Sequence, residues 1–439
     1  MAQAADRGSD PGPDEDALRP SVRVPLAVIA REWGRIGVTG FGGPPAHIAL
    51  LRRLCVQRRA WIPADEFEDA IATVSLLPGP ASTQLAIWCG WRLRGRTGAL
   101  VAGFCFIVPG LVVILALSAV FLAKHPPDWI LGAAAGAGSA VPAVAVHAAA
   151  GLAPASWKRI RNGAGTNAAA GTTAAAEHIT ASPGRPAAQT GSRSRRAASG
   201  RWIAYALIGG TAAATLGPYL VLFLLFCGLI EIAVRVRSAA LLRTLLPLGL
   251  PTAAAAALAA APGGIGAVAW IAFKVGALSY GGGFVIIPLM QHDAVNAYHW
   301  LSNAQFLDAV ALGQVTPGPV VLTVGVVGYA AAGPAGALLA VLIAFSPSFL
   351  FVLLGGRHFD RLRGSDRIQA FLTGAGPAVI GAIAGAAIPL ALALGHGWQY
   401  PLLAAAGVWL LAARRGVVSA LLLAAACGLV ASLAGLPVG

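Results

Sequence analysis

Charged side chains are scarce in this chain, at 11% of its 439 residues, whereas a soluble domain carries about 25%. Apolar residues make up 57% of the sequence, more than a water-soluble core needs, so lipid must be the solvent for most of the chain. Apolar stretches recur, for example at Gly98–Leu122, Leu241–Pro262 and Pro334–Gly355. Each is long enough to cross a hydrocarbon core of ~30 Å as a helix. Short segments of alternating polarity are missing, which excludes a transmembrane β-barrel. The sequence therefore predicts an all-α polytopic membrane protein.

Signatures of catalysis are missing as well. The five cysteines form no CxxC or metal-type spacing, and no P-loop, HExxH or GxSxG motif is present. We therefore expect no enzymatic activity, no cofactor and no metal. No soluble segment is large enough for a nucleotide-binding domain, which excludes an ATP-driven pump. The net charge of +14 lies mostly in loops between apolar segments, so it indicates cytoplasmic loops rather than binding to nucleic acid.

An internal repeat is the strongest sign of how the chain is organised. GVTGFGGP at Gly37–Pro44 matches GALSYGGG at Gly276–Gly283, and LLPGP at Leu76–Pro80 matches VTPGP at Val315–Pro319. Both pairs are 239 residues apart (276 − 37 and 317 − 78). We call the first pair the glycine motifs and the second pair the PGP motifs. The match predicts two homologous halves.

The composition divides the chain into five parts. The segment between the halves is rich in Gly, Ala, Ser and Thr, and from Pro154 to Arg201 it contains eight Lys or Arg and a single acid, Glu177. This composition predicts a flexible, basic, cytoplasmic linker. The predicted parts are an acidic disordered N-terminal tail (1–21), a first repeat (22–152), the linker (153–201), connecting transmembrane helices (202–262) and a second repeat (263–439).

The equivalent loops of the two repeats differ in charge. In the first repeat, Arg52–Arg59 and Arg92–Arg96 carry several arginines, whereas the matching stretches Gln291–His299 and Ala330–Ala335 contain no Lys or Arg. Because positive loops face the cytoplasm, this difference predicts two halves of inverted topology, as in many secondary transporters.

Both basic loops of the first repeat flank one apolar segment, Glu66–Trp91. A full crossing would place one arginine cluster outside, whereas a re-entrant hairpin keeps both on the same side. Proline removes a backbone donor and glycine permits a tight turn. We therefore expect two half-helices with the PGP motif at the deep tip, and the same for Ala304–Tyr329 from the outer side. The glycine motifs are candidate broken hairpins too. In the alternative interpretation, each motif segment crosses the membrane once.

Broken helices suit the binding of an anion, because they direct free N–H groups and positive dipole ends inward. After Pro80 the next half-helix begins with Ser82, Thr83 and Gln84, whose side chains could hold a small oxyanion, whereas the residues after Pro319 are less polar. From the two pairs of motifs we assign to substrate binding Gly42, Gly43, Pro78, Gly79, Pro80, Ser82, Thr83, Gln84, Gly281, Gly282, Pro317, Gly318 and Pro319.

Charged residues within the apolar segments extend this hypothesis. Lys274 and Arg35 occupy matching positions, and a charge at membrane depth must be solvated or paired. We expect Lys274 to face a cavity and assign both cations to a dianion site; snorkelling or pairing with a carboxylate is the alternative. Asp69 and Asp308 also match, and are either proton relays or structural groups. His47 follows the first glycine motif, but its counterpart is Ile286, so the repeat does not support a shared role.

These motifs together resemble the chromate ion transporter family in its long, two-domain form. The matching pieces lie at Gly34–Leu51, Ser75–Trp91, Phe273–Met290 and Gly313–Tyr329. The resemblance implies chromate export across the bacterial inner membrane and chromate resistance. It also implies a role for a glutamine before the PGP motif, which Gln314 keeps and Ser75 replaces in the first repeat.

Two alternatives remain beside chromate export. Sulfate is close to chromate in shape and charge, so transport or uptake of sulfate or another oxyanion is one. A membrane scaffold that transports nothing is the other. The expected partners are the oxyanion and the lipid bilayer, with a second copy of the chain as a candidate.

Overall fold

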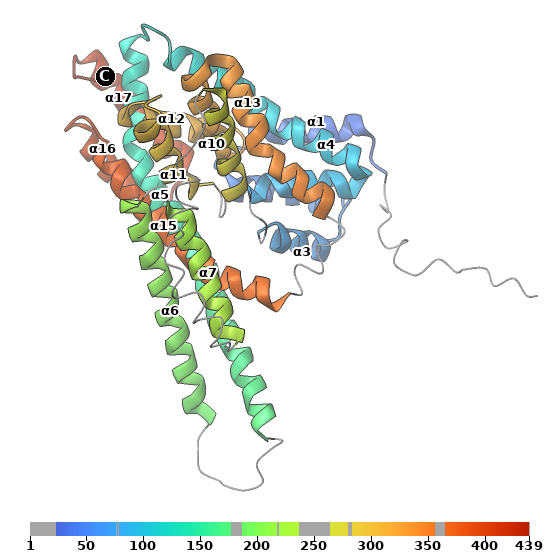
Figure 1. Ribbon diagram of the computed structural model, residues 1–439. Coiled ribbons are helices and arrows are strands. Elements are labelled where there is room, and N and C mark those ends of the chain that lie inside the picture. The colour runs from blue at the N-terminus through green and yellow to red at the C-terminus, as the bar shows by residue number, and fades with distance from the viewer. Residues whose placement is uncertain are drawn as a thin grey trace, which may run out of the picture.

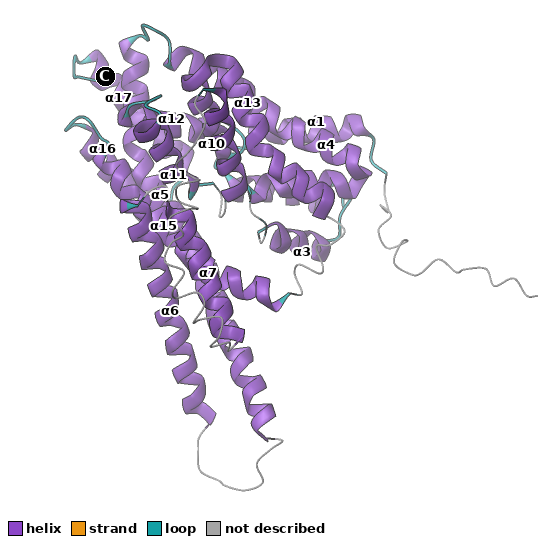
Figure 2. Cartoon of the chain, viewed as in Figure 1, coloured by secondary structure: helices purple, strands orange, loops and turns teal. Residues whose placement is uncertain are grey.

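The computed structural model is helical wherever it describes the chain (Figures 1 and 2). It describes residues 23–75, 77, 79–176, 187–216, 219–236, 264–279, 283–355 and 365–438, with backbone alone at 161–176, 187–195 and 236. The predicted tail at 1–21 and the crossing predicted near 244–262 lie outside these residues.

The helices of the first half are α1 (Leu26–Thr39), α2 (Pro44–Arg52), η1 (Arg53–Arg58), α3 (Ala64–Val74), α4 (Ala81–Phe121), α5 (Asp128–Ala176), α6 (Ala187–Thr215) and α7 (Leu220–Val236). Those of the second half are α10 (Ile265–Leu278), α11 (Ile286–Gln291), η3 (His292–Ala297), α12 (Asn303–Val315), η4 (Val320–Leu322), α13 (Thr323–Gly355), α15 (Asp366–Leu392), α16 (Gln399–Gly407), η6 (Val408–Ala412) and α17 (Val417–Leu433).

Large apolar side chains cover much of the outer surface. Val112 on α4, Leu207 on α6 and Leu354 on α13 are 59%, 63% and 61% exposed. Such a surface is stable only against lipid. Four helices in the described part are long and apolar enough to cross a membrane: Ala81–Phe121, Asp128–Ile160, Val320–Gly355 and Asp366–Leu392. The protein is therefore a multi-pass membrane protein.

The first PGP segment folds as the predicted hairpin. Helix α3 ends at Val74 and α4 begins at Ala81, so the chain breaks at the PGP motif. Glu66, near the start of α3, forms an ion pair with Arg92, which lies 26 residues later in α4. The two arms must fold back on each other for this pair to form, so both ends of the hairpin lie at the same level.

A second hairpin surrounds the first glycine motif. Between α1 and α2 the chain leaves the helical conformation, with Gly42 and Gly43 at φ values of 97° and 74°. Arg59, after η1, bonds to Glu32 in α1 at 3.1 Å, so α2 and η1 return along α1. The chain is therefore broken at the first glycine motif.

The second repeat reproduces this backbone at positions that match to within one residue (332 − 94 = 238 for the bend and 292 − 53 = 239 for the π-helix). The long helices α4 and α13 both bend sharply, with φ/ψ of −149°/22° and 63°/−151° at Arg94 and Gly95, and −150°/30° and 63°/−155° at Ala332 and Gly333. Short π-helices also recur at η1 and η3. Duplication of the sequence is therefore duplication of the structure.

The predicted linker differs from the structure. Helix α5 runs on to Ala176, and α6 begins at Ala187, so most of the residues from 153 to 201 are helical where we expected flexible backbone. Figure 1 shows these helices as a long pair that projects from the rest of the protein. Alanine is abundant in this segment, and its helix propensity is the highest of all residues.

Candidate functional site

The two repeats meet through the tips of their broken helices. The Gly79 N–H of the first PGP motif donates a hydrogen bond of 2.8 Å to the Ser279 carbonyl of the second repeat. The Gly318 N–H of the second PGP motif donates one of 2.9 Å to the Gly40 carbonyl of the first repeat. Because 79 matches 318 and 40 matches 279 at the same offset, the two bonds are equivalent. Each PGP tip therefore rests on the glycine-motif hairpin of the other repeat.

Backbone N–H groups point toward this junction from the start of α4. The Thr83 and Gln84 N–H groups both bond to the Pro80 carbonyl, at 2.9 and 3.0 Å. Ala81 and Ser82 lie in the first turn of α4, where N–H groups have no partner within the helix. Ser82, Thr83 and Gln84 are buried, as an anion site in the protein interior requires.

Several buried polar side chains near the tips have no hydrogen-bond partner among the described residues. They are Thr83 Oγ1, Ser279 Oγ, Gln314 Nε2 and Ser348 Oγ. A Cβ built on Gly79 would lie 3.2 Å from Ser348 Oγ, so this hydroxyl sits against the first tip. Burying a hydroxyl or amide without a hydrogen-bond partner is unfavourable. A bound ligand that supplied the missing hydrogen bonds would remove this cost.

The second tip offers fewer donors. Residues Val320–Leu322 form a single 3₁₀ turn before α13, and the Thr323 hydroxyl bonds to the Val320 carbonyl at 2.8 Å. That hydroxyl is therefore occupied, whereas the one of Thr83 is not. The expected difference in polarity between the two half-sites is present in the structure.

The environment of Lys274 differs from the predicted one. Lys274 is 5% exposed and pairs with Asp293 in η3, with 2.5 Å between Nζ and Oδ2. The Trp270 ring lies 5.7 Å from the same ammonium group. The prediction that Lys274 faces a cavity is therefore corrected, because a carboxylate neutralises the buried charge. Arg35, at the matching position of α1, is exposed, so the two cations do not share one environment.

The matching aspartates also differ. Asp69 lies on an exposed face of α3, whereas Asp308 on α12 is 8% exposed. Asp308 lines a cavity of about 340 Å³ together with Lys124, Gln305 and His396. This cavity lies where the loop after α4, the loop after α15 and the C-terminal end of the chain come together.

The structure describes some, but not all, of the other residues that we assigned to substrate binding. Pro78, Gly281 and Gly282 lie outside the described residues. A Cβ built on Gly43 would lie 3.7 Å from Val320, so the first glycine motif reaches the second tip. Pro80, Pro317 and Pro319 are buried beside the tips.

Sequence reasoning missed His47. Its ring is fully buried, with Nε2 2.9 Å from the Gly40 carbonyl and Nδ1 3.4 Å from Ser82 Oγ. Its counterpart in the repeat is Ile286, so the repeat carries no signal for it. Ser279 and Ser348 were missed as well. The signal for Ser279 was available, because it matches Gly40 in the repeat and lies within the second glycine motif.

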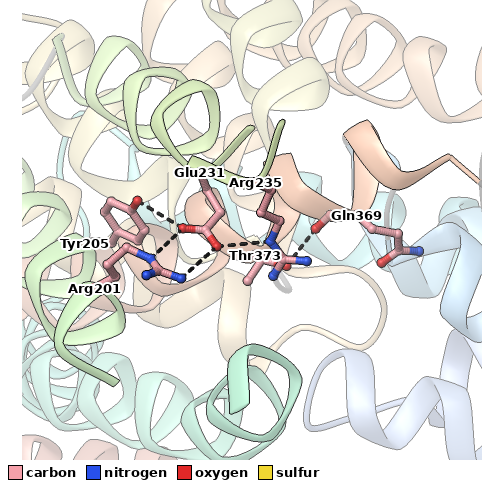
Figure 3. Close-up of polar contacts among 6 residues, drawn as sticks. All are labelled: Arg201, Tyr205, Glu231, Arg235, Gln369 and Thr373. Atoms are coloured by element: carbon pink, nitrogen blue, oxygen red, sulfur yellow. Dashed lines mark hydrogen bonds and ion pairs between the residues drawn. The ribbon is translucent and has the colours of Figure 1, made fainter. Parts of the chain in front are cut away.

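A further buried acid, Glu231, was also missed. It accepts hydrogen bonds from Arg201 and Arg235, at 3.0 and 3.1 Å, and from the Tyr205 hydroxyl at 3.2 Å (Figure 3). A lone acid within the apolar run of α7 was the available signal. Two guanidinium groups neutralise it, so the cluster ties α6 to α7.

A second cavity in the described part, of about 520 Å³, is almost entirely apolar. Its walls come from α7, α10, α11 and α15, and Arg367 is the charged residue among them. A dianion would lose its hydration there without gaining enough donors, so we place the candidate site at the tips.

Comparisons with known proteins agree with the duplicated architecture. The chain matches the family described as "Chromate transporter" over residues 27–230 and 266–431, once in each half. No solved structure matches the chain.

Several relatives cover most of the chain. It is 31% identical to a chromate transport protein of Pseudomonas aeruginosa, over 89% of this chain and 88% of the relative. It is 30% identical to one of Cupriavidus metallidurans, over 81% and 80%. An uncharacterized transporter of Methanocaldococcus jannaschii is 25% identical over 75% of each chain. From the two-part match and these identities, the chain belongs to the chromate transporter family.

Proposed function

We propose that the protein is a secondary transporter that exports chromate across the bacterial inner membrane and so confers chromate resistance. The reciprocal contact of the two PGP tips is the observation that carries this proposal. It brings backbone donors and unpartnered hydroxyls together inside a protein whose surface is apolar. Irregular backbone at membrane depth is tolerated where protein or a watery cavity satisfies it.

The donors at the first tip suit a tetrahedral oxyanion. The N–H groups of Ala81 and Ser82 lie at the positive end of the first arm of α4. The hydroxyls of Thr83, Ser279 and Ser348 are buried beside them. Since Lys274 is neutralised by Asp293, backbone dipoles and hydroxyls hold the anion in this proposal.

The two repeats have inverted orientations in this proposal. Helix α12 begins beside a cavity whose walls include the loop after α4 and Val438 near the C-terminus. The base of the first hairpin instead carries Arg92, which pairs with Glu66. Positive loops favour the cytoplasm, so the first hairpin enters from inside and the second from outside.

The membrane potential favours export. Moving one elementary charge across 100 mV is worth ~2.3 kcal/mol. A dianion that leaves a negative interior therefore gains roughly 4.6 kcal/mol at that potential. Export needs no coupled ion, whereas uptake of the same dianion needs several co-transported cations.

Purified protein in liposomes tests the function. With an imposed potential, labelled chromate is expected to move toward the positive side, and excess sulfate is expected to slow it. A protein that moves neither anion under any gradient contradicts the proposal. Sulfate transport without chromate transport would favour the oxyanion alternative.

Cysteine labelling tests the inversion separately. Single cysteines near Arg58 and near Asn296, in a background that lacks the native cysteines, are expected to react with an impermeant reagent from opposite sides. Reaction from the same side would refute the inverted arrangement without affecting the flux result.

A further inference from the structure

His47 lies at the junction of the two repeats, and it is the titratable group in the described part that contacts the tips most directly. Its ring packs edge-on against Phe106, with 5.1 Å between ring centroids. Nε2 contacts the Gly40 carbonyl, which also accepts the hydrogen bond from Gly318. One carbonyl oxygen therefore joins the imidazole to the second PGP tip.

The partners of the ring define its tautomer. A carbonyl oxygen only accepts hydrogen bonds, so Nε2 carries a proton and donates it to Gly40. In the neutral ring, Nδ1 then has a lone pair and accepts the hydroxyl proton of Ser82. When His47 is neutral, the Ser82 hydroxyl donates its hydrogen bond to the ring and cannot donate it to an anion.

A second proton on the ring reverses this arrangement. Nδ1 becomes a donor to Ser82 Oγ, and the serine hydroxyl is released to donate toward the start of α4. The ring also gains a positive charge beside the N-terminus of that helix. A buried imidazolium is unfavourable by itself, whereas a neighbouring dianion compensates it.

Other charges on the surrounding elements do not contact the ring. Glu32 on α1, Arg52 on α2 and Arg92 on α4 are engaged in ion pairs. Arg35 on α1 is exposed, and Asp308 on α12 lines the cavity described above. The ring contacts Gly40, Ser82 and Phe106, which are all neutral.

The second repeat has no equivalent proton site. Ile286 replaces the histidine, and Ser279 replaces Gly40. A Cβ at position 40 would lie 2.7 Å from His47 Cδ2 and 2.9 Å from Nε2, so glycine there makes room for the ring. His47 therefore has no titratable counterpart at the matching position of the second repeat.

We propose that His47 is a substrate-positioning residue that takes up one proton when the oxyanion binds, and thereby turns the Ser82 hydroxyl toward the anion. This inference rests on the proposed function. Proton and dianion bind together, so each strengthens the binding of the other.

Calorimetric titration of chromate into the purified protein, in two buffers of different ionisation enthalpy, tests it. Wild type is expected to take up about one proton for each bound anion. His47→Gln is expected to take up none beyond what chromate itself binds, since its amide can donate to Gly40 and accept from Ser82 without titrating. His147→Gln, which removes a histidine of α5, should match wild type. Equal proton uptake by wild type and His47→Gln overturns the inference.

Wild-type protein alone gives a second measurement, in case His47→Gln does not fold. Between about pH 7.5 and about pH 8.5, the affinity for chromate should fall by up to about tenfold. A flat profile overturns the role of His47 while leaving oxyanion binding intact. Absence of chromate binding at any pH refutes the proposed function, and the inference with it.

Discussion

The two repeats share one backbone but differ in what surrounds their matching residues. Arg35 and Asp69 of the first repeat are exposed, whereas Lys274 and Asp308 of the second are buried. Helix α12 packs against α5, α13 and α17, whereas α3 packs mainly against α4. Duplication therefore reproduced the local geometry, while tertiary packing determined the environment of each charge.

This asymmetry has a functional meaning within the proposed inversion. A transporter with inverted repeats alternates between states in which each repeat adopts the packing of the other. Other helices surround the second hairpin, whereas the first hairpin is more exposed. Under the proposed inversion, this arrangement corresponds to a state in which the site is accessible from the side of the membrane on which the first hairpin begins. The following predictions test that comparison, from the largest expected effect to the smallest.

The buried pair Lys274–Asp293 should give the largest effect. Lys274→Ala leaves a buried carboxylate unpaired, which costs about 3–5 kcal/mol, whereas Arg35→Ala at the exposed matching position should cost less than about 0.5 kcal/mol. Thermal unfolding in detergent measures both. The double variant Lys274→Met, Asp293→Leu should recover most of the stability. If Lys274→Ala keeps its Tm but loses transport, the lysine binds the anion after all.

The two PGP tips should differ in their response to alanine. Gly79 and Gly318 have φ values of 123° and 107°, so a side chain at either costs about 1–3 kcal/mol. At Gly79 the new Cβ would also lie 2.4 Å from Gln84 Nε2, whereas at Gly318 the nearest atom, of Leu322, is 3.3 Å away. Gly79→Ala should therefore reduce chromate flux and stability more than Gly318→Ala. The opposite order would argue against the first tip as the main site.

The matching aspartates should differ in reactivity. In a cysteine-free background, Asp69→Cys should react with a charged thiol reagent at least about tenfold faster than Asp308→Cys, since thiol reactivity requires access. If the two repeats alternate between the two kinds of packing during transport, saturating chromate should make the reaction rates of the two cysteines more similar. Unequal rates that chromate leaves unchanged would mean that the asymmetry is permanent.

The Glu66–Arg92 pair at the base of the first hairpin should give the smallest effect. Its side chains are 30% and 20% exposed, so Arg92→Gln should cost about 1 kcal/mol or less. Tyr329→Phe, near the equivalent point of the second hairpin, serves as the control because no ion pair is lost there. A loss of insertion with Arg92→Gln would indicate that the arginine determines orientation rather than stability.

Much of the backbone could be predicted from the sequence. The break around Pro80 was recognisable from its proline and glycine residues, and the ion pair of Arg92 with Glu66 shows that the two arms approach each other. The repeat offset also predicted which residues would be equivalent. The environment of Lys274 was not predictable, because Asp293 lies in the next hairpin arm and its counterpart in the first repeat is Leu54.

The sequence by itself determined the membrane as solvent, the duplication and the breaks at glycine and proline, because these follow from composition and backbone chemistry. Only the tertiary structure decided that each PGP tip bonds to the opposite glycine motif and that His47 contacts Ser82. Such contacts depend on side chains that are distant in the chain and come together only when the helices pack. Local propensities carry no information about those pairs.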